Sequence, residues 1–273
     1  MHIAALLAAA VLSGWTQVGT GPDGGTVWSG RIPNTFVADR RASAIYLPPG
    51  YDATRRYPVL YLLHGLEGSP AEYWQSLHLA QRLDGLFASG ARPFIVVTPV
   101  GGQLAHPNAG EWAGPWERYI VGDVVPWVDS HLSTIASPRA RVLEGLCAGG
   151  YGAVDIGLRH PAVFGGLGSW EGYLTPFRDG PLAHATEPQL AAHDPALIVR
   201  KEAAVLRRDG TSFYLSAGGN HAQVRGIWTI AFARELTRLR LRHVLWVAPK
   251  DARRRFWSAT VPSALQFAVS EFE

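Results

Sequence analysis

Short, continuous apolar runs alternate along this chain with segments of helical periodicity. Such runs, bounded by turn signals, are typical of strands that are buried on both faces of a sheet. The predicted strands are residues 43–47, 57–63, 94–98, 141–145, 163–167, 212–216 and 243–247. The predicted helices are residues 119–131, 150–159, 195–208, 224–239 and 262–272. This alternation predicts an α/β fold, with a mostly parallel central sheet and helices on both of its faces.

The composition agrees with one large domain. Apolar residues make up 47% of the 273 residues and charged residues only 17%, which excludes a disordered or strongly charged tail protein. We find no repeat, low-complexity tract or long linker in the sequence, so residues 15–273 are predicted to form a single domain. Residues 15–41 are rich in Gly, Pro, Asp and Thr, and predict a segment of short edge strands.

The first residues resemble part of a targeting signal. Residues 3–12 are apolar and rich in Ala and Leu, as in the hydrophobic region of a signal peptide. His2, rather than a Lys or Arg, precedes this region, and a clean cleavage site is hard to place near Ser13 and Gly14. Residues 1–14 are therefore interpreted as a signal peptide or as the stub of a membrane anchor. We expect an extracytoplasmic protein, secreted or attached to a membrane surface, and a single Cys fits that location.

Charge and motif content exclude several classes of function. The net charge is +3, but the Arg residues are scattered and the basic run at 253–255 is too short for a nucleic-acid-binding arm. The single Cys excludes a disulfide framework and a Cys-based zinc site, and no phosphate-binding loop pattern occurs. The acidic and His residues between 179 and 194 are irregularly spaced for a metal site. We therefore expect no nucleic acid, metal or cofactor; the oligomeric state is left open.

The sharpest local signal is GLCAG at residues 145–149, which follows an apolar run and opens a predicted helix. This is the G-x-S-x-G nucleophile elbow with Cys147 in place of Ser. The turn is tight, so side chains two positions to either side of the nucleophile would collide. A helix N-terminus stabilises a thiolate, so Cys147 is predicted to be the nucleophile. The alternative is a small buried cysteine in a glycine-rich turn.

A second signal is HGLEG at residues 64–68, directly after another apolar run. In an α/β-hydrolase fold, a turn at this place supplies one N–H group of the oxyanion hole. The predicted donors are the backbone N–H groups of Leu66 and Ala148, which would stabilise a developing oxyanion. His64 is expected to fix this loop rather than to act as the general base.

Several stretches of the sequence, taken together, match the pattern of one protein family: YPVLYLLHGL at 57–66, PWERY at 115–119, DVVPW at 123–127, GLCAGGYGA at 145–153, RHPAVF at 159–164 and RFW at 255–257. Together they resemble the esterase family of α/β hydrolases that includes the mycolyltransferases and the S-formylglutathione hydrolases. The resemblance extends from about residue 42 to residue 271. It implies an eight-stranded, mostly parallel sheet and acyl transfer from a small-molecule ester, thioester or acyl-glycan substrate.

The catalytic positions depart from that family. The resemblance places the family's catalytic His at Ala252, and its acid in SAGGNH at 216–221, where there is a His but no carboxylate. One hypothesis is a rebuilt site, in which His221 serves as the base of Cys147 and Glu171 orients His221. The alternative is a catalytically impaired pseudo-hydrolase that has lost its base and acts as a binding protein. In that case His221 is a polar loop residue before the next helix.

Overall fold

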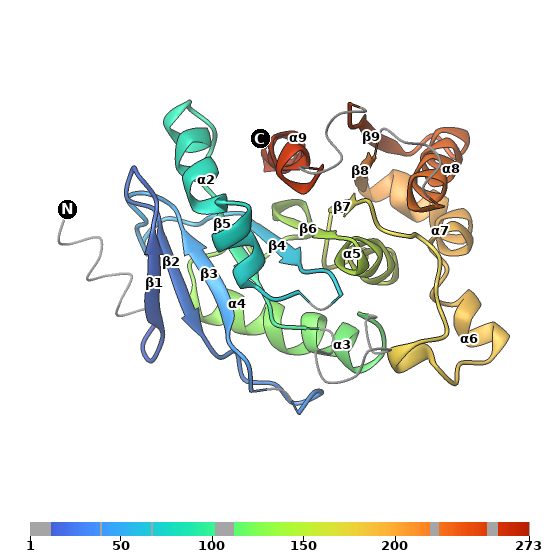
Figure 1. Cartoon of the computed structure of the whole chain (residues 1–273), viewed down its shortest axis with the longest axis horizontal. Coiled ribbons are helices and arrows are strands. Elements are labelled where there is room, and N and C mark those ends of the chain that lie inside the picture. Colours follow the sequence, from blue (N-terminus) through green and yellow to red (C-terminus); the bar gives the residue numbers. More distant parts are fainter. Residues whose placement is uncertain are drawn as a thin grey trace.

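A nine-stranded sheet forms the centre of the described part of the chain (Figure 1). The computed structural model describes residues 12–272, except 39, 67, 102–111, 219–223 and 250–255. The strands are β1 (Thr16–Thr20), β2 (Thr26–Gly30), β3 (Ser43–Leu47), β4 (Val59–Leu63), β5 (Ile95–Thr98), β6 (Arg141–Leu146), β7 (Gly166–Trp170), β8 (Ser212–Ala217) and β9 (Arg242–Val247). Their order in the sheet is β1-β2-β3-β5-β4-β6-β7-β8-β9.

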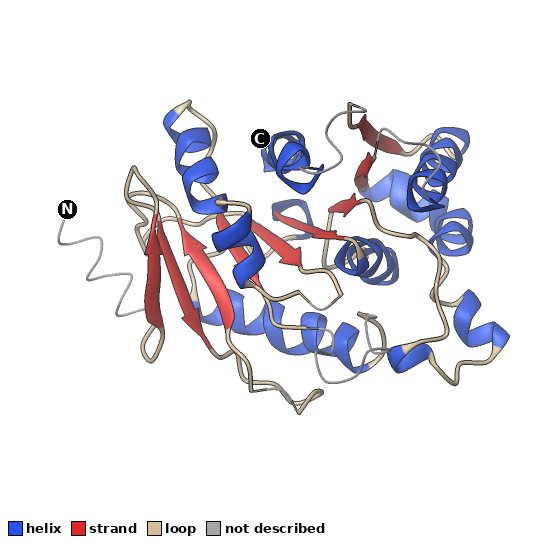
Figure 2. Cartoon of the chain, in the orientation of Figure 1, coloured by secondary structure: helices blue, strands red, loops and turns tan. Residues whose placement is uncertain are grey.

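The sheet is antiparallel from β1 to β5 and parallel from β5 to β9. Helices cover both of its faces, as the colouring by secondary structure in Figure 2 shows. The α-helices are α2 (Leu79–Ala88), α3 (Pro115–Arg118), α4 (Val125–His131), α5 (Ala148–Arg159), α6 (Glu187–Ala191), α7 (Pro195–Asp209), α8 (Val224–Arg238) and α9 (Phe256–Phe272). Two π-helical segments, η1 (Glu72–Ser76) and η2 (Tyr119–Val124), precede α2 and α4.

Alternate residues of the central strands pack into two separate cores. In β4, Val59, Tyr61 and Leu63 face the core beneath α4, α5, α7 and α8, whereas Leu60 and Leu62 face the core beneath η1, α2 and α9. Every residue of β4 is buried, which is why its sequence is a continuous apolar run rather than an alternating one. The mostly parallel α/β-hydrolase fold predicted from the sequence is confirmed.

Two details differ from expectation. The sheet has nine strands rather than the eight that the resemblance implies, because β1 and β2 form a hairpin at its edge. The strand predicted at 163–167 lies three residues later, as β7. A Cβ atom at Gly168 would overlap the side chain of Glu144 on the neighbouring strand. Close packing therefore demands a small residue there, and this weakens the apolar signal of β7.

The prediction for residues 1–14 falls mostly outside the described residues and stays a prediction, as does the expected location. In the part of the chain that the structure describes, none of the helices combines the length and apolar composition needed to cross a bilayer.

Candidate active site

Cys147 occupies the turn between β6 and α5, with φ 53° and ψ −116°. A non-glycine residue in this region is strained by about 1–3 kcal/mol, and such strain is common at functional sites. A Cβ atom at Gly149 would overlap the carbonyl oxygen of Leu63, and one at Gly145 would lie 2.6 Å from that same oxygen. The two glycines are therefore required by close backbone packing, as expected for a nucleophile elbow.

Cys147 lines a cleft. The residue is partly exposed and lines a depression of about 540 Å³ at the carboxyl end of the sheet. Its N–H donates to the carbonyl of Trp170 at 3.0 Å, and its carbonyl accepts the N–H of Tyr151 at 3.1 Å in the first turn of α5. This partial exposure argues against the alternative of a fully buried structural cysteine.

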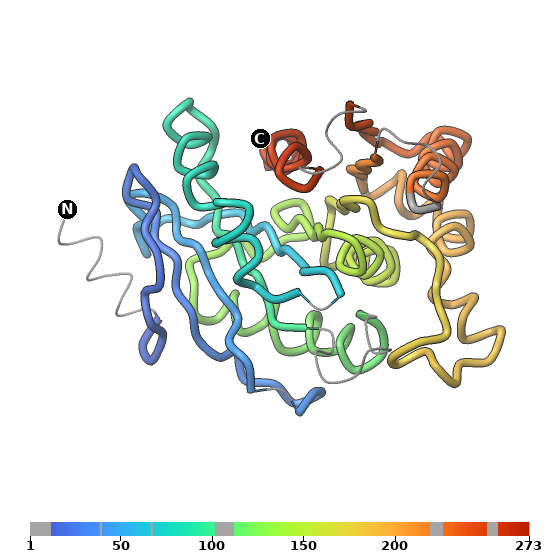
Figure 3. The backbone as a smooth tube through the Cα atoms, in the orientation of Figure 1, coloured from blue at the N-terminus to red at the C-terminus, as the bar shows by residue number. Residues whose placement is uncertain are grey.

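The loop after β4 lies against the elbow, and the backbone tube in Figure 3 shows it beside the start of α5. A Cβ atom at Gly65 would lie 3.3 Å from the Cβ atom of Cys147. Leu66 lines the same cleft as Cys147. Ala148 is the first residue of α5, where backbone N–H groups have no acceptor within the helix. Leu66 and Ala148 thus flank Cys147, and their role as oxyanion donors stays a prediction.

His64 holds this loop in place. Its ring is buried, and its Nε2 atom accepts the N–H of Gly101 at 3.2 Å. The proton of the neutral ring is then on Nδ1, which donates to the carbonyl of Gly65 at 2.8 Å. Trp112 Nε1 donates to the carbonyl of His64 at 3.1 Å. These contacts fit the structural role expected from the sequence.

Glu171 directly follows β7, is buried, and has a positive φ of 53°. Its Oε1 atom accepts the N–H of Gly218 at 2.9 Å, and its own N–H donates to the carbonyl of Ser216 at 3.0 Å. Gly218 is the last described residue before 219–223, so the carboxylate lies where the segment that carries His221 begins. His221 itself lies outside the described residues, as does Ala252. The pairing of His221 with Cys147 or Glu171 therefore stays a prediction.

Other residues of the cleft were not anticipated from the sequence. Glu72, Gln75 and Ser76 of η1 form one wall, and Trp257 at the start of α9 also lines the cleft. Glu72 is thus a titratable group in the same cleft as Cys147, and burial raises its pKa. No motif marks Glu72, and its position shortly after the HGLEG turn is the only signal in the sequence.

A buried carboxyl group lies beneath the elbow. Glu144 is the residue before Gly145 in β6, and its Oε2 atom accepts Trp170 Nε1–H at 2.6 Å. Burial raises the pKa of Glu144 to about 8, although the hydrogen bond from Trp170 opposes this shift. Glu144 is therefore mostly protonated at neutral pH. Sequence analysis missed it because a single acidic residue inside an apolar strand indicates nothing about its partner.

Comparison with known proteins identifies the family to which this sequence is similar. The family described as "Putative esterase" matches residues 36–249, which is more than half of the chain. Esterase Rv1288 of Mycobacterium tuberculosis is 27% identical over 158 residues, 56% of this chain and 34% of that protein. The match thus spans only about a third of the length of this relative.

Solved structures share the fold at low sequence identity. A ferulic acid esterase has a TM-score of 0.78 at 20% identity, covering 91% of this chain and 99% of that one. An S-formylglutathione hydrolase from Agrobacterium tumefaciens has a TM-score of 0.69 at 16% identity, covering 94% and 99%. S-formylglutathione hydrolases are one of the two groups that the motifs resemble. The family model over residues 36–249 shows that the chain belongs to the putative esterase family of α/β hydrolases.

Proposed function

We propose that the chain hydrolyses or transfers an acyl group through an acyl-Cys147 intermediate. One observation carries the proposal: Cys147 is partly exposed in a strained elbow at the N-terminus of α5, and Leu66 lines the same cleft. The helix N-terminus stabilises a thiolate, and the elbow presents it to a substrate in the cleft. Membership of an esterase family supports the same chemistry.

In the proposed reaction, the thiolate of Cys147 attacks the carbonyl carbon of an ester. The carbonyl oxygen becomes an oxyanion, which accepts hydrogen bonds from the N–H groups of Leu66 and Ala148. Collapse of this intermediate expels the alcohol, which takes up the proton first removed from the thiol. Water or an acceptor alcohol then attacks the thioester and releases Cys147. His221 would carry the proton in both steps, with Glu171 orienting it.

The substrate is proposed to be a small-molecule ester, a thioester or an acyl-glycan. One protein of the same fold is named a ferulic acid esterase, so a feruloyl ester is a suitable first probe. The extracytoplasmic location expected from the N-terminal residues would give access to such compounds outside the cell.

A second candidate function is binding without turnover. Ala252 stands where the family resemblance places the catalytic His, and this observation favours a pseudo-hydrolase. Such a protein would keep the cleft and bind an ester without forming a covalent intermediate.

Hydrolysis of p-nitrophenyl acetate separates the two functions. The esterase proposal expects a measurable rate that is lost in Cys147→Ala and in His221→Ala. Asp251→Asn is the matched control and should leave the rate nearly unchanged, because a carboxylate close in sequence to the three Arg residues at 253–255 is a poor base. A rate that is unaffected by Cys147→Ala contradicts the proposal.

A further inference from the structure

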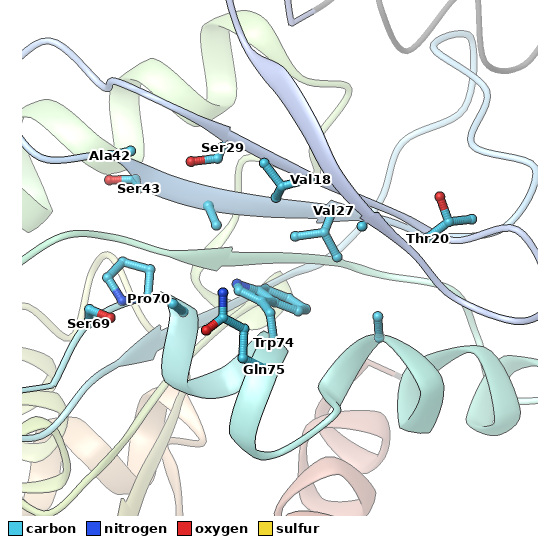
Figure 4. Close-up of a pocket in the computed structure, with 14 residues that line it drawn as sticks. Val18, Thr20, Val27, Ser29, Ala42, Ser43, Ser69, Pro70, Trp74 and Gln75 are labelled. Atoms are coloured by element: carbon cyan, nitrogen blue, oxygen red, sulfur yellow. The ribbon is translucent and has the colours of Figure 1, made fainter.

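A second groove lies between η1 and the β1–β2 hairpin (Figure 4). It has a volume of about 420 Å³ and is lined by residues of β1, β2, β3, η1, α2 and the two loops that precede β3 and η1. We call it the hairpin groove, after the β1–β2 hairpin that forms one wall. Figure 4 shows Val18 and Val27 on the strands, with Trp74 and Gln75 on the opposite side.

The hairpin groove is uncharged and largely apolar. Its 14 described lining residues include valines, alanines, Pro70 and Trp74, and none of these 14 is Asp, Glu, Lys, Arg or His. Trp74 is fixed, since its Nε1 donates to Thr98 Oγ1 at 3.0 Å and its ring stacks on Tyr46 at 6.0 Å. Val18 on β1 is 59% exposed at the groove. An apolar ligand would cover this side chain.

The hairpin groove adjoins the cleft of Cys147. Ser69 and Ala71, which precede η1, and Gln75 within η1 line both depressions, so the two adjoin along this segment. No acidic or basic side chain is among these three shared residues. An apolar chain whose carbonyl carbon lies at Cys147 can therefore pass over Ala71 into the hairpin groove, beside Glu72 on the wall of the cleft.

We propose that the hairpin groove binds the aliphatic acyl chain of an ester whose carbonyl carbon is presented to Cys147. This inference rests on the proposed function and adds the substrate class. The groove volume falls within the range of about 300–1,000 Å³ that is usual for small-molecule sites. A helix with its side chains is about 10 Å wide, so acetyl and butyryl groups end before η1 is crossed, whereas chains of about eight carbons or more reach the groove.

The first test is a series of p-nitrophenyl esters from acetate to decanoate. For each methylene that enters the groove, kcat/KM is expected to rise up to about fourfold. Ala80→Trp fills the groove from α2 and should abolish this rise while leaving acetate hydrolysis unchanged. Ala88→Trp, at the exposed end of the same helix and outside the groove, is the matched control and should keep the rise. If Ala80→Trp does not fold, Ala42→Trp, at an exposed position that lines the groove, should fill the groove instead.

The second test measures binding alone, by calorimetric titration of decanoate into Cys147→Ala. Binding that is weakened at least tenfold by an added Ala80→Trp supports the groove even if no esterase activity is found. Two results would overturn the proposed acyl-chain binding and leave the proposed function intact. One is esterase activity that does not depend on acyl length. The other is activity that Ala80→Trp and Ala88→Trp change equally. Ala80→Trp that dissociates a dimer without weakening decanoate binding also overturns it, because the groove would then be a contact between two copies.

Discussion

The backbone N–H of Cys147 donates to the carbonyl of Trp170 at 3.0 Å, and this bond ties the elbow to the end of the neighbouring strand. The indole of the same Trp170 donates to the buried carboxyl group of Glu144 at 2.6 Å. Cys147 is thus connected through one residue to a carboxyl group whose pKa is raised to about 8 by burial. The turn that holds Cys147 is therefore linked by two hydrogen bonds to a buried carboxyl group.

Glu144→Gln should remove a pH dependence of stability. The pKa of Glu144 is raised from 4.5 to about 8 in the folded protein, so the folded state binds more protons than the unfolded state between these values. The resulting stabilisation is present below pH 4.5 and is lost as pH rises through 8, by at most about 5 kcal/mol. Urea unfolding should find the variant more stable than wild type at pH 9. The exposed Glu187→Gln serves as control, and a parallel loss of stability with pH in wild type and Glu144→Gln contradicts the prediction.

Gly149→Ala should destabilise the protein, because the added methyl group overlaps the carbonyl oxygen of Leu63. A backbone atom cannot move aside as a side-chain tip can, so the free energy of unfolding should fall by about 2–4 kcal/mol. Gly85→Ala in α2 is the matched control, since no atom outside its chain neighbours and the nearby backbone of its own helix lies within 4 Å of the added Cβ. That change should stabilise the helix by about 0.5–1 kcal/mol. Equal thermal midpoints for the two variants would show that the turn is not closely packed.

Glu171→Gln tests the orienting role of this carboxylate. The amide oxygen can still accept the N–H of Gly218, so the free energy of unfolding should change by less than about 1 kcal/mol. The negative charge is lost, and kcat for p-nitrophenyl acetate should fall at least about tenfold. Glu171→Ala additionally leaves the Gly218 N–H unpaired and should destabilise the fold by about 1–3 kcal/mol. Full activity in Glu171→Gln would assign this residue a purely structural role.

Cys147→Ser should lower the esterase rate about 100-fold or more. A hydroxyl gives up its proton far less easily than a thiol, so it needs a stronger and better aligned base than His221 is expected to provide. The two proteins should have similar thermal midpoints, which separates a chemical effect from unfolding. A serine variant that is faster than wild type would mean that a competent general base is present and that the thiol is the weaker nucleophile.

The sequence was sufficient to predict the elements whose signal is local. Continuous apolar runs marked β4 and β5, and the glycines around Cys147 marked the elbow, because crowding at that turn acts directly on residue type. Contacts between distant segments could not be predicted in this way. Glu144 becomes a buried partner of Trp170 only when β6 and β7 pair. Gly168 leaves space for the side chain of Glu144, and this glycine interrupts the apolar pattern by which β7 could have been predicted.

The residues that line the cleft and the groove also could not be predicted from local sequence patterns. Glu72 and Gln75 belong to η1, a short π-helical segment that has no sequence signature, and the hairpin groove forms only where the first strands meet that segment. Cys147, Leu66 and Ala148 meet around one turn because each lies at a junction that the fold places at the carboxyl edge of the sheet. The roles of His221 and Glu171 stay predictions, as do the interpretations of residues 1–14.

The most direct measurement is the intact mass of the protein after brief exposure to p-nitrophenyl acetate and acid quenching. The account predicts an increase of one acetyl group, located on the peptide that contains Cys147, removed by hydroxylamine and absent in Cys147→Ala. Release of p-nitrophenol with no adduct on Cys147, or with an acetyl group on another residue, would contradict the account.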